Sequence, residues 1–502
     1  ATVLAPDDPL LVHPDRAWTV GRLAEEHGVD TRQVVRLLRL ALTANAVEIG
    51  PVVGPAGDDF AALRRIVDDM GEHPGASAWR DRLAALEEVR RELERAAFPA
   101  RAAVFERIER LFTDATATPA RRQGGLYTDR FVVYEESSSP FRLELGGAAA
   151  RKLTASVQEA LDQSAAYGDT LRRGHQEHVL RRWPDVSRLP LPVYLDRAAE
   201  SADGTRFSAG PPIPAPLAAP ARPGPRYALP DLCLAAPDVD AIAAGAFRVV
   251  VSRVHHHLLL NSWLAVAHPD PAGFAVRSTS WVGRHGAAVG LLGIEVSRRN
   301  KAFYRFPGEK LALRPRNAVD VGDPSVRHVG DFDVVRDGDV LRLVDRDGRE
   351  RTLYLPLADL VTHPPLAALS SPPALHPQIR PPGAQRVPAV VLGGAVYQRS
   401  RWHTTAPDLK PLDMAARYVA LRGIARELEL PRFVYIRSDR RRKPYLLDTR
   451  SPFAAELLAH VTEPGEDVQL EEMLPAPDDL WLRDEQGRRY TAELRVQAVT
   501  SW

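Results

Sequence analysis

Four groups of charged or polar residues have types and spacing suited to chemistry. They are the basic run Arg437, Arg440, Arg441, Arg442 and Lys443, the pair Arg314 and Arg316, the carboxylates Glu135 and Glu136, and the histidines His255, His256 and His257. Guanidinium groups bind phosphate in a bidentate manner and stabilise negative charge that develops during a reaction. Carboxylates bind ammonium groups or act as bases. Each group also has a plainer interpretation as a solvated strand end or hairpin tip.

The histidines and the single cysteine are weaker candidates. Strand alternation would place His255 and His257 on one face, as a metal pair needs, but no carboxylate or cysteine follows at a useful spacing. We therefore predict no metal site. Cys233 lies in the apolar run 232–236, which favours an inert, buried thiol over a nucleophile and excludes an intrachain disulfide.

The charge balance limits the partners that the chain can bind. Among 502 residues, Lys and Arg number 66 and Asp and Glu number 65, which gives a formal net charge of +1. A uniformly basic nucleic-acid binder is thus excluded, and any contact with nucleic acid must come from a local patch. Arginine greatly outnumbers lysine, which suits phosphate recognition but also follows from arginine-favouring codon usage.

Several other classes find no support. The chain has no P-loop, no Gly-x-Gly-x-x-Gly and no Gly-x-Ser-x-Gly, so binding of ATP or a dinucleotide and serine hydrolysis are not indicated. No apolar run is long enough to span a bilayer, and the first residues do not form a signal peptide. We expect a cytoplasmic protein without a membrane span.

The helices and strands predicted around these residues indicate a mixed α+β fold. Residues 1–55 have the pattern of a winged helix: a helix over 18–27, a stop at Gly28, a cap at Asp30 or Thr31, a second helix and a strand at 47–49. Such a unit binds DNA, binds a peptide along its wing, or is structural. DNA reading is the weakest of the three, because no Arg and Asn cluster marks a base-reading face.

The rest of the chain divides into three parts by composition. A helical and strand segment covers 56–210, a Pro-rich connection covers 211–230 and a β-rich remainder covers 231–502. We predict helices at 58–72, 79–113, 411–428 and 452–460, and strands at 127–136, 247–254, 274–279, 311–313, 331–336, 340–345 and 433–436, with a closing hairpin at 481–496.

Four stretches resemble the glutamylation half of lantibiotic dehydratases. They are YTDRFVVYEES at 127–137, LPDLCLAAPDVDAIAAGAFRVVVSRVHHHL at 229–258, PRFVYIRSDRRRKPYLLDTRSPFAAELL at 431–458 and EEMLPAPDDLWLRDEQGRRYTAELR at 471–495. The last two are the most specific. Order and spacing agree from about residue 15 to the end, and His256 aligns best with the histidine of the family.

The resemblance implies a function. Members of this family transfer glutamate, or another amino acid in the related peptide aminoacyl-tRNA ligases, from its tRNA to a ribosomally made precursor peptide. The co-substrate is the aminoacyl-tRNA, and no further cofactor is implied. In dehydratases the acceptors are Ser and Thr hydroxyls, and a second domain eliminates the glutamate.

The same resemblance suggests roles for the candidate residues. Arg314 and Arg316, with Glu135 and Glu136, would be catalytic. The run Arg437, Arg440, Arg441, Arg442 and Lys443 would bind tRNA phosphates. In the winged-helix unit, Val34, Leu38, Val47 and Ile49 would contact the precursor peptide.

Two departures from the family pattern bear on activity. The elimination domain is not in this sequence, so we expect a separate elimination protein. The family's Arg-rich region running into Thr/Ser-Pro-Phe-Gly is also missing, so either the chain is a fragment, or a further subunit carries that region, or the chain is a degenerate member without transfer activity. The alternative is a non-catalytic subunit, or a degenerate member, that binds the precursor peptide.

Overall fold

The computed structural model describes most of the chain. It covers residues 20–43, 59–121, 132–133, 143–200, 226–256, 270, 273, 276–277, 280, 284, 290–294, 308–312, 325–354, 364–438, 440–441 and 443–500. Helices and several β-sheets alternate along these residues, which confirms the α+β class. Among the described helices, none is long and apolar enough to cross a membrane.

The first two helices form a small unit of their own. They are α1 (Val20–His27) and α2 (Thr31–Thr43), and Gly28 between them has a φ of 58°. The carboxylate of Asp30 accepts a hydrogen bond of 2.7 Å from the backbone N–H of Arg32, as a helix cap does. Val34 is fully buried against α1, and Leu38 packs beside it. The helix pair is thus confirmed, whereas the predicted wing strand at 47–49 lies outside the described residues.

Three further helices follow: α3 (Asp59–Asp69), α4 (Pro74–Arg95) and α5 (Phe98–Thr116). The helical character predicted over 79–113 is confirmed except at residues 96–97, which separate α4 from α5. Pro99, in the first turn of α5, has no N–H to continue the hydrogen-bond ladder of α4. Val132 and Val133, the described part of the strand predicted at 127–136, pack against α4 and α5 and are not in a strand.

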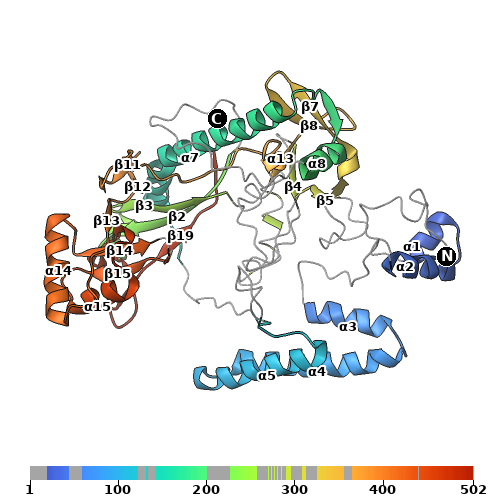
Figure 1. The fold of residues 1–502 in the computed structure, drawn as a ribbon, viewed down its shortest axis with the longest axis horizontal. Helices are drawn as coiled ribbons and strands as arrows, with labels where there is room; N and C mark the ends of the chain where they lie inside the picture. The colour runs from blue at the N-terminus through green and yellow to red at the C-terminus, as the bar shows by residue number, and fades with distance from the viewer. Residues whose placement is uncertain are drawn as a thin grey trace.

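A 36-residue helix, α7 (Gly147–Arg182), links the two larger parts of the molecule. It packs against β3 and β12 with its first half and against β8 and α13 with its second half (Figure 1). Gly168 lies at a close approach, since a Cβ there would stand 1.7 Å from the carbonyl oxygen of Pro373. The sequence analysis did not predict this helix.

A seven-stranded sheet contacts the second half of α7. Its order is β1-β7-β8-β9-β4-β5-β6. The strands are β1 (Arg188–Pro190), β4 (Leu291–Ile294), β5 (Lys310–Ala312), β6 (Val326–His328), β7 (Phe332–Asp337), β8 (Val340–Asp345) and β9 (Glu350–Tyr354). The helices α8 (Leu191–Glu200) and α13 (Pro364–Ala367) belong to this part, and Tyr194 and Leu341 are among its fully buried residues. The β7–β8 hairpin is confirmed, with Gly338 in its turn.

A second sheet covers the first half of α7. Its order is β11-β12-β3-β2-β19, and β20 also pairs with β2. The strands are β2 (Arg226–Ala235), β3 (Arg248–His255), β11 (Val390–Leu392), β12 (Ala395–Gln398), β19 (Glu493–Arg495) and β20 (Ala498–Thr500), and α9 (Val239–Ala243) joins β2 to β3. β2 begins inside the stretch 211–230 predicted as a Pro-rich connection. Val276 and Arg277 are helical, so they contradict the strand predicted at 274–279.

The third sheet forms the C-terminal body, drawn in orange and red in Figure 1. Its order is β10-β13-β16-β14-β15. The strands are β10 (Arg386–Val387), β13 (Arg401–Thr405), β14 (Phe433–Ser438), β15 (Tyr445–Asp448) and β16 (Asp467–Glu472), and the helices α14 (Met414–Glu427) and α15 (Pro452–Val461) cover one face. The short pair β17 (Leu482–Arg483) and β18 (Arg489–Tyr490) precedes β19. These positions confirm the predicted helices at 411–428 and 452–460.

A cavity between two sheets as the candidate functional site

Strand alternation in the third sheet separates an apolar face from a polar one. Val434 and Ile436 of β14 and Leu470 of β16 pack against α14 and α15. The residues between them therefore point to the opposite face. There the register pairs Arg401 of β13 with Glu471 of β16 and pairs Glu471 with Tyr435 of β14. One row of polar side chains thus crosses three strands.

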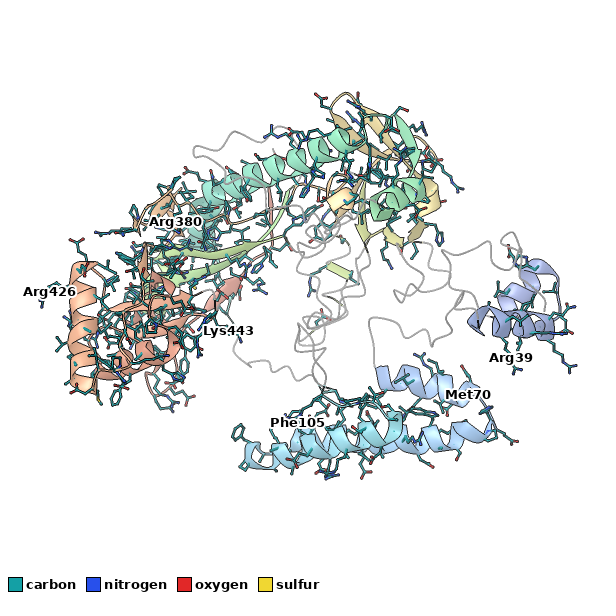
Figure 2. All side chains as sticks on the ribbon, in the orientation of Figure 1. Arg39, Met70, Phe105, Arg380, Arg426 and Lys443 are labelled. Atoms are coloured by element: carbon teal, nitrogen blue, oxygen red, sulfur yellow. The ribbon has the colours of Figure 1, made fainter. Side chains whose placement is uncertain are left out.

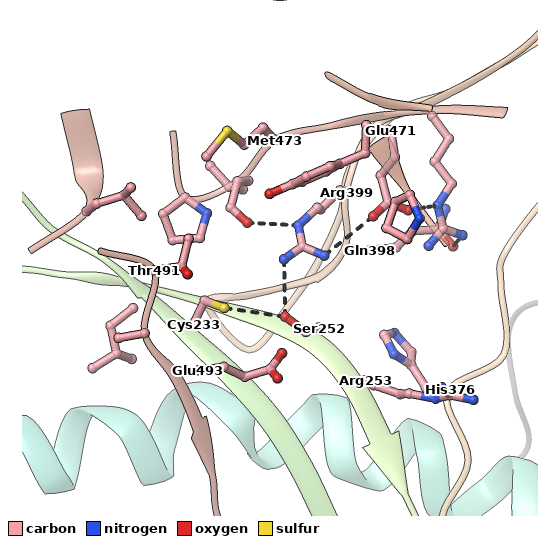
Figure 3. A pocket seen from close by; sticks show the side chains of 18 of the residues that line it. Cys233, Ser252, Arg253, His376, Gln398, Arg399, Glu471, Met473, Thr491 and Glu493 are labelled. Carbon is pink, nitrogen blue, oxygen red and sulfur yellow. Dashed lines mark hydrogen bonds and ion pairs between the residues drawn. The ribbon is translucent and has the colours of Figure 1, made fainter. Parts of the chain in front are cut away.

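The second sheet supplies the facing wall. The β2–β3 register shifts between Asp231 and Leu232, so that Ser252 is the extra residue of a β-bulge. The hydroxyl of Ser252 lies 3.4 Å from the thiol of Cys233 (Figure 3). Between the two walls is a cavity of about 590 Å³, which residues of β12, β19 and the segments 376–378 and 473–475 complete.

Glu471 is the centre of the cavity's ion pairs. It is 4% exposed, and three arginines surround it. The Nε of Arg401 donates to its Oε2 at 2.6 Å, a guanidinium nitrogen of Arg399 lies 3.5 Å from Oε1, and one of Arg437 lies 3.6 Å from Oε2. Both oxygens are therefore engaged by a cluster in which arginines outnumber the carboxylate three to one.

Two of these side chains are fixed by further hydrogen bonds. Arg399 donates through Nε to the carbonyl of Leu474 at 2.8 Å and through Nη2 to the hydroxyl of Ser252 at 3.2 Å (Figure 3). Gln398, which is 2% exposed, accepts from the backbone N–H of Ile379 at 2.8 Å and donates to its carbonyl at 3.0 Å. Arg401 in turn donates to the amide oxygen of Gln398 at 3.4 Å. The protein itself thus holds the side chains of Arg399 and Arg401 in place.

Burial and the arginine charges shift several pKa values in the cavity. Burial lowers the pKa of Arg401, and the nearby charges of Arg437 and Arg399 lower it further against the opposing effect of Glu471. Burial also lowers the pKa of His376 to about 4, so its imidazole is neutral at pH 7, and its Nε2 lies 2.7 Å from the carbonyl of Tyr397. Burial raises the pKa of the Cys233 thiol, but this side chain is only half-buried and lines the cavity, so the burial predicted for it is not confirmed.

A second charge cluster lies further along β2. Asp231, 4% exposed, accepts from Arg495 of β19 at 2.6 Å and 2.8 Å, and its Oδ2 lies 2.7 Å from Nε2 of His255. Burial opposes ionisation of this carboxyl, but the hydrogen bonds from His255 and Arg495 lower its pKa to about 2. His255 therefore has a carboxylate partner in the sheet. His257 lies outside the described residues.

The basic run 437–443 is divided between two environments. Arg437 lies on β14 and lines the cavity. Arg440, Arg441 and Lys443 are exposed in the turn between β14 and β15, and Arg442 lies outside the described residues. Figure 2 shows Lys443 at one edge of the C-terminal body and Arg426 of α14 at the other. The sequence analysis placed Arg437 in the same exposed basic run as the turn residues, whereas the alternation of β14 directs its side chain into the cavity.

The remaining sequence-predicted site residues fall elsewhere. Arg314, Arg316, Glu135 and Glu136 all lie outside the described residues, as do Val47 and Ile49. Val34 is enclosed between α1 and α2, and Leu38 is half-buried beside it. The catalytic and peptide-binding roles suggested for these residues therefore remain predictions.

The sequence analysis missed the residues that build the cavity. Arg399, Arg401 and Glu471 were not candidates, nor were Ser252 and Gln398. A signal was available in β16, where Glu471 alternates with Leu470 in a strand flanked by apolar residues. A carboxylate on the second face of such a strand needs a cationic partner if that face is covered. Nothing in the sequence showed that it is covered.

Comparison with known proteins gives a result at the level of structure only. No family model and no curated protein sequence matches the chain. The solved glutamylation domain TbtB, from thiomuracin biosynthesis, matches 98% of the chain at 17% identity with a TM-score of 0.58. The chain has the fold of this glutamylation domain. A second structure of the TbtB domain, bound to 5'-phosphodesmethylglutamycin, matches equally well, with a TM-score of 0.57.

A longer enzyme shares the same fold. The tRNA-dependent lantibiotic dehydratase MibB from Microbispora sp. 107891 matches 90% of the chain at 15% identity with a TM-score of 0.53. The chain spans 66% of the TbtB domain and 49% of MibB. The resemblance to the glutamylation half of lantibiotic dehydratases is thus confirmed in the fold.

Proposed function

We propose that this protein takes part in tRNA-dependent transfer of an amino acid, glutamate, to Ser or Thr side chains of a ribosomally made precursor peptide. The observation that carries the proposal is the shared fold with the TbtB glutamylation domain over 98% of the chain. An aminoacyl ester is already activated, so the site mainly needs to position the acyl carbon and stabilise developing negative charge.

The charges of the described residues suit an anionic co-substrate. The cavity holds arginines in excess over carboxylates, and the turn at Arg440, Arg441 and Lys443 adds exposed cations on the same sheet. Since the net charge of the chain is only +1, these local patches are where attraction to a tRNA would be concentrated. A small-molecule cofactor is not part of the proposal.

The sequence-based roles complete the proposal. Arg314 and Arg316 would stabilise the tetrahedral centre, and Glu135 or Glu136 would bind the ammonium group or act as base.

The test is a transfer assay with the full chain, glutamyl-tRNA and the cognate precursor peptide, with and without candidate partner subunits. We expect the peptide to gain mass in steps of one glutamyl residue. Replacing Arg314 and Arg316 by Ser should lower the transfer rate more than the affinity for tRNA. If the peptide binds but gains no mass with any partner present, the protein is a peptide-binding subunit and the proposed transfer is wrong.

A further inference from the structure

The charges that line the cavity do not balance. Three arginines, Arg399, Arg401 and Arg437, surround one buried glutamate, Glu471, which leaves an excess of two positive charges; the exposed pair Arg253 and Glu493 adds one charge of each sign. His376 does not add to this excess, because its pKa of about 4 keeps it neutral at pH 7. Enclosing an excess of charge costs free energy unless an opposite charge compensates it. A ligand anion would supply that compensation.

Arg437 is the arginine best placed to meet an anion. Arg399 and Arg401 are 14% and 12% exposed and are tied to the protein by hydrogen bonds shorter than 3 Å. Arg437 is 34% exposed, and its ion pair with Glu471 spans 3.6 Å, beyond ordinary hydrogen-bond length. Its guanidinium can turn to an incoming oxyanion while Arg399 and Arg401 continue to neutralise Glu471.

Aromatic and apolar side chains form another part of the lining, beside the polar side chains of Ser252, Gln378, Gln398 and Thr491. Tyr435, Trp481 and Tyr490 line the cavity, together with Met473 and Pro475. Planar aromatic side chains stack on any nucleobase, because every base has a planar π-face. Arginines beside such aromatic side chains can bind the phosphate of the same nucleotide. A small inorganic ion would leave these walls unused, whereas a nucleotide presents both a phosphate and a planar ring. The volume of about 590 Å³ falls in the range of small-molecule sites.

We infer that this cavity binds a nucleotide, with its phosphate on Arg437 and its base against the aromatic wall. One part of the inference rests on the proposed function: the nucleotide is taken to be the terminal nucleotide of the tRNA. No covalent step is assigned to the cavity. Glu471 serves to hold Arg399 and Arg401 in place.

Cys233 is the single cysteine of the sequence, so the rate of labelling by a thiol reagent reports on this one position in the cavity. Cys233 lines the cavity, so a bound nucleotide should slow its reaction with a thiol reagent in the full-length protein. The probes are 5'-AMP, adenosine, inorganic phosphate and free glutamate, each titrated against the labelling rate. We expect 5'-AMP to protect Cys233 at lower concentration than adenosine or phosphate alone, since it engages both walls.

Two variants form a matched pair. Arg437→Ala should weaken 5'-AMP about ten- to a hundredfold, the range expected for a charge-assisted hydrogen bond. Arg426→Ala, which removes the same charge from an exposed position of α14 at the other edge of the C-terminal body, should leave 5'-AMP binding unchanged. Arg437→Lys should recover part of the affinity, because lysine keeps the positive charge but cannot form the bidentate hydrogen bonds of a guanidinium group. A thermal melt of each variant verifies that the fold is intact.

Two results would overturn the inference: equal protection by 5'-AMP in wild type and Arg437→Ala, or protection by glutamate alone, which would make the cavity a carboxylate site. The transfer assay separates this failure from failure of the proposed function. Transfer that survives Arg437→Ala, with no protection by 5'-AMP, rejects the cavity and keeps the function. Protection that depends on Arg437, with no transfer under any condition, keeps the cavity and rejects the function.

Discussion

Arg437 and Arg440 belong to one basic run, yet they occupy two different regions of the C-terminal body. Arg437 lies on β14 beside the buried carboxylate of Glu471, in a cavity covered by a second sheet. Arg440 is exposed in the turn that follows, where its charge contributes to the lowered pKa of Glu463 after the larger effect of Lys410. An arginine interacts more strongly with a nearby charge in the cavity than in the turn, because water screens charges in the turn.

One basic run in the sequence thus contains residues in two different environments. In the cavity, Arg399, Arg401 and Glu471 hold one another, so that removing one of them leaves the others uncompensated. In the turn, the described charges are solvated and would act on a nucleic-acid partner mainly through counterion release. The cavity is therefore expected to respond to single substitutions, and the turn to respond to salt and to several substitutions together.

The largest expected effect concerns the buried carboxylate. Glu471→Leu would leave Arg399, Arg401 and Arg437 facing one another without their shared counter-charge. We expect the free energy of unfolding to fall by ~3–5 kcal/mol, as when one partner of a buried ion pair is lost. Urea denaturation would measure it. Glu463→Gln, which removes a solvated carboxylate paired with Lys410 near the turn, is the control and should change little.

The second-largest expected effect is a loss of stability at acid pH that depends on His376 in the cavity. His376 has a pKa of about 4 in the fold and an ordinary value of 6.5, so the unfolded chain takes up the proton first as pH falls. His376 should therefore reduce stability progressively between about pH 6.5 and pH 4, by ~2–3 kcal/mol in total. His376→Gln should flatten that part of the stability curve. The exposed His460 on α15 offers the control, and an equal flattening by His460→Gln would contradict the assignment.

The turn should show its role in the salt dependence of tRNA binding. Replacing Arg440, Arg441 and Arg442 together by Ser should lower the slope of log affinity against log salt by about two to three units if all three touch phosphates. Filter binding or fluorescence anisotropy at several salt concentrations would measure the slope. Arg437→Ser should lower it by about one unit at most. If the triple variant keeps the wild-type slope, the turn is only solvated surface.

The smallest effect compares two serines that accept hydrogen bonds in the two regions. Ser252→Ala would leave a guanidinium nitrogen of the nearly buried Arg399 without its acceptor, at a cost of about 1–2 kcal/mol. Ser438→Ala removes a hydroxyl that accepts from the backbone N–H of Arg441 at 3.2 Å and is only 9% exposed, so its loss should cost a comparable amount. An unchanged melting temperature of Ser252→Ala would contradict the role given to its hydroxyl.

Much of the local structure could be predicted from the sequence because it depends on short-range patterns. The helix pair around Gly28, the hairpin at Gly338, the strand at 433–436 and the helix that begins at Pro452 follow from turn residues, caps and alternation. The long helix α7 was missed. Its two halves pack against different sheets, and no single apolar stripe runs its whole length.

By itself, the sequence determined the fold class, the alternating faces of β14 and β16 and the existence of a basic run. The tertiary structure alone decided that the polar face of these strands is covered by β2 and β3. That covering converts Arg399, Arg401 and Arg437 from surface residues into the lining of a cavity around Glu471. Local sequence sets the direction in which a side chain points. The low-dielectric surroundings that strengthen its electrostatic interactions come from distant strands, since Ser252 of β3 and Arg399, which meet across the cavity, are 147 residues apart in the chain.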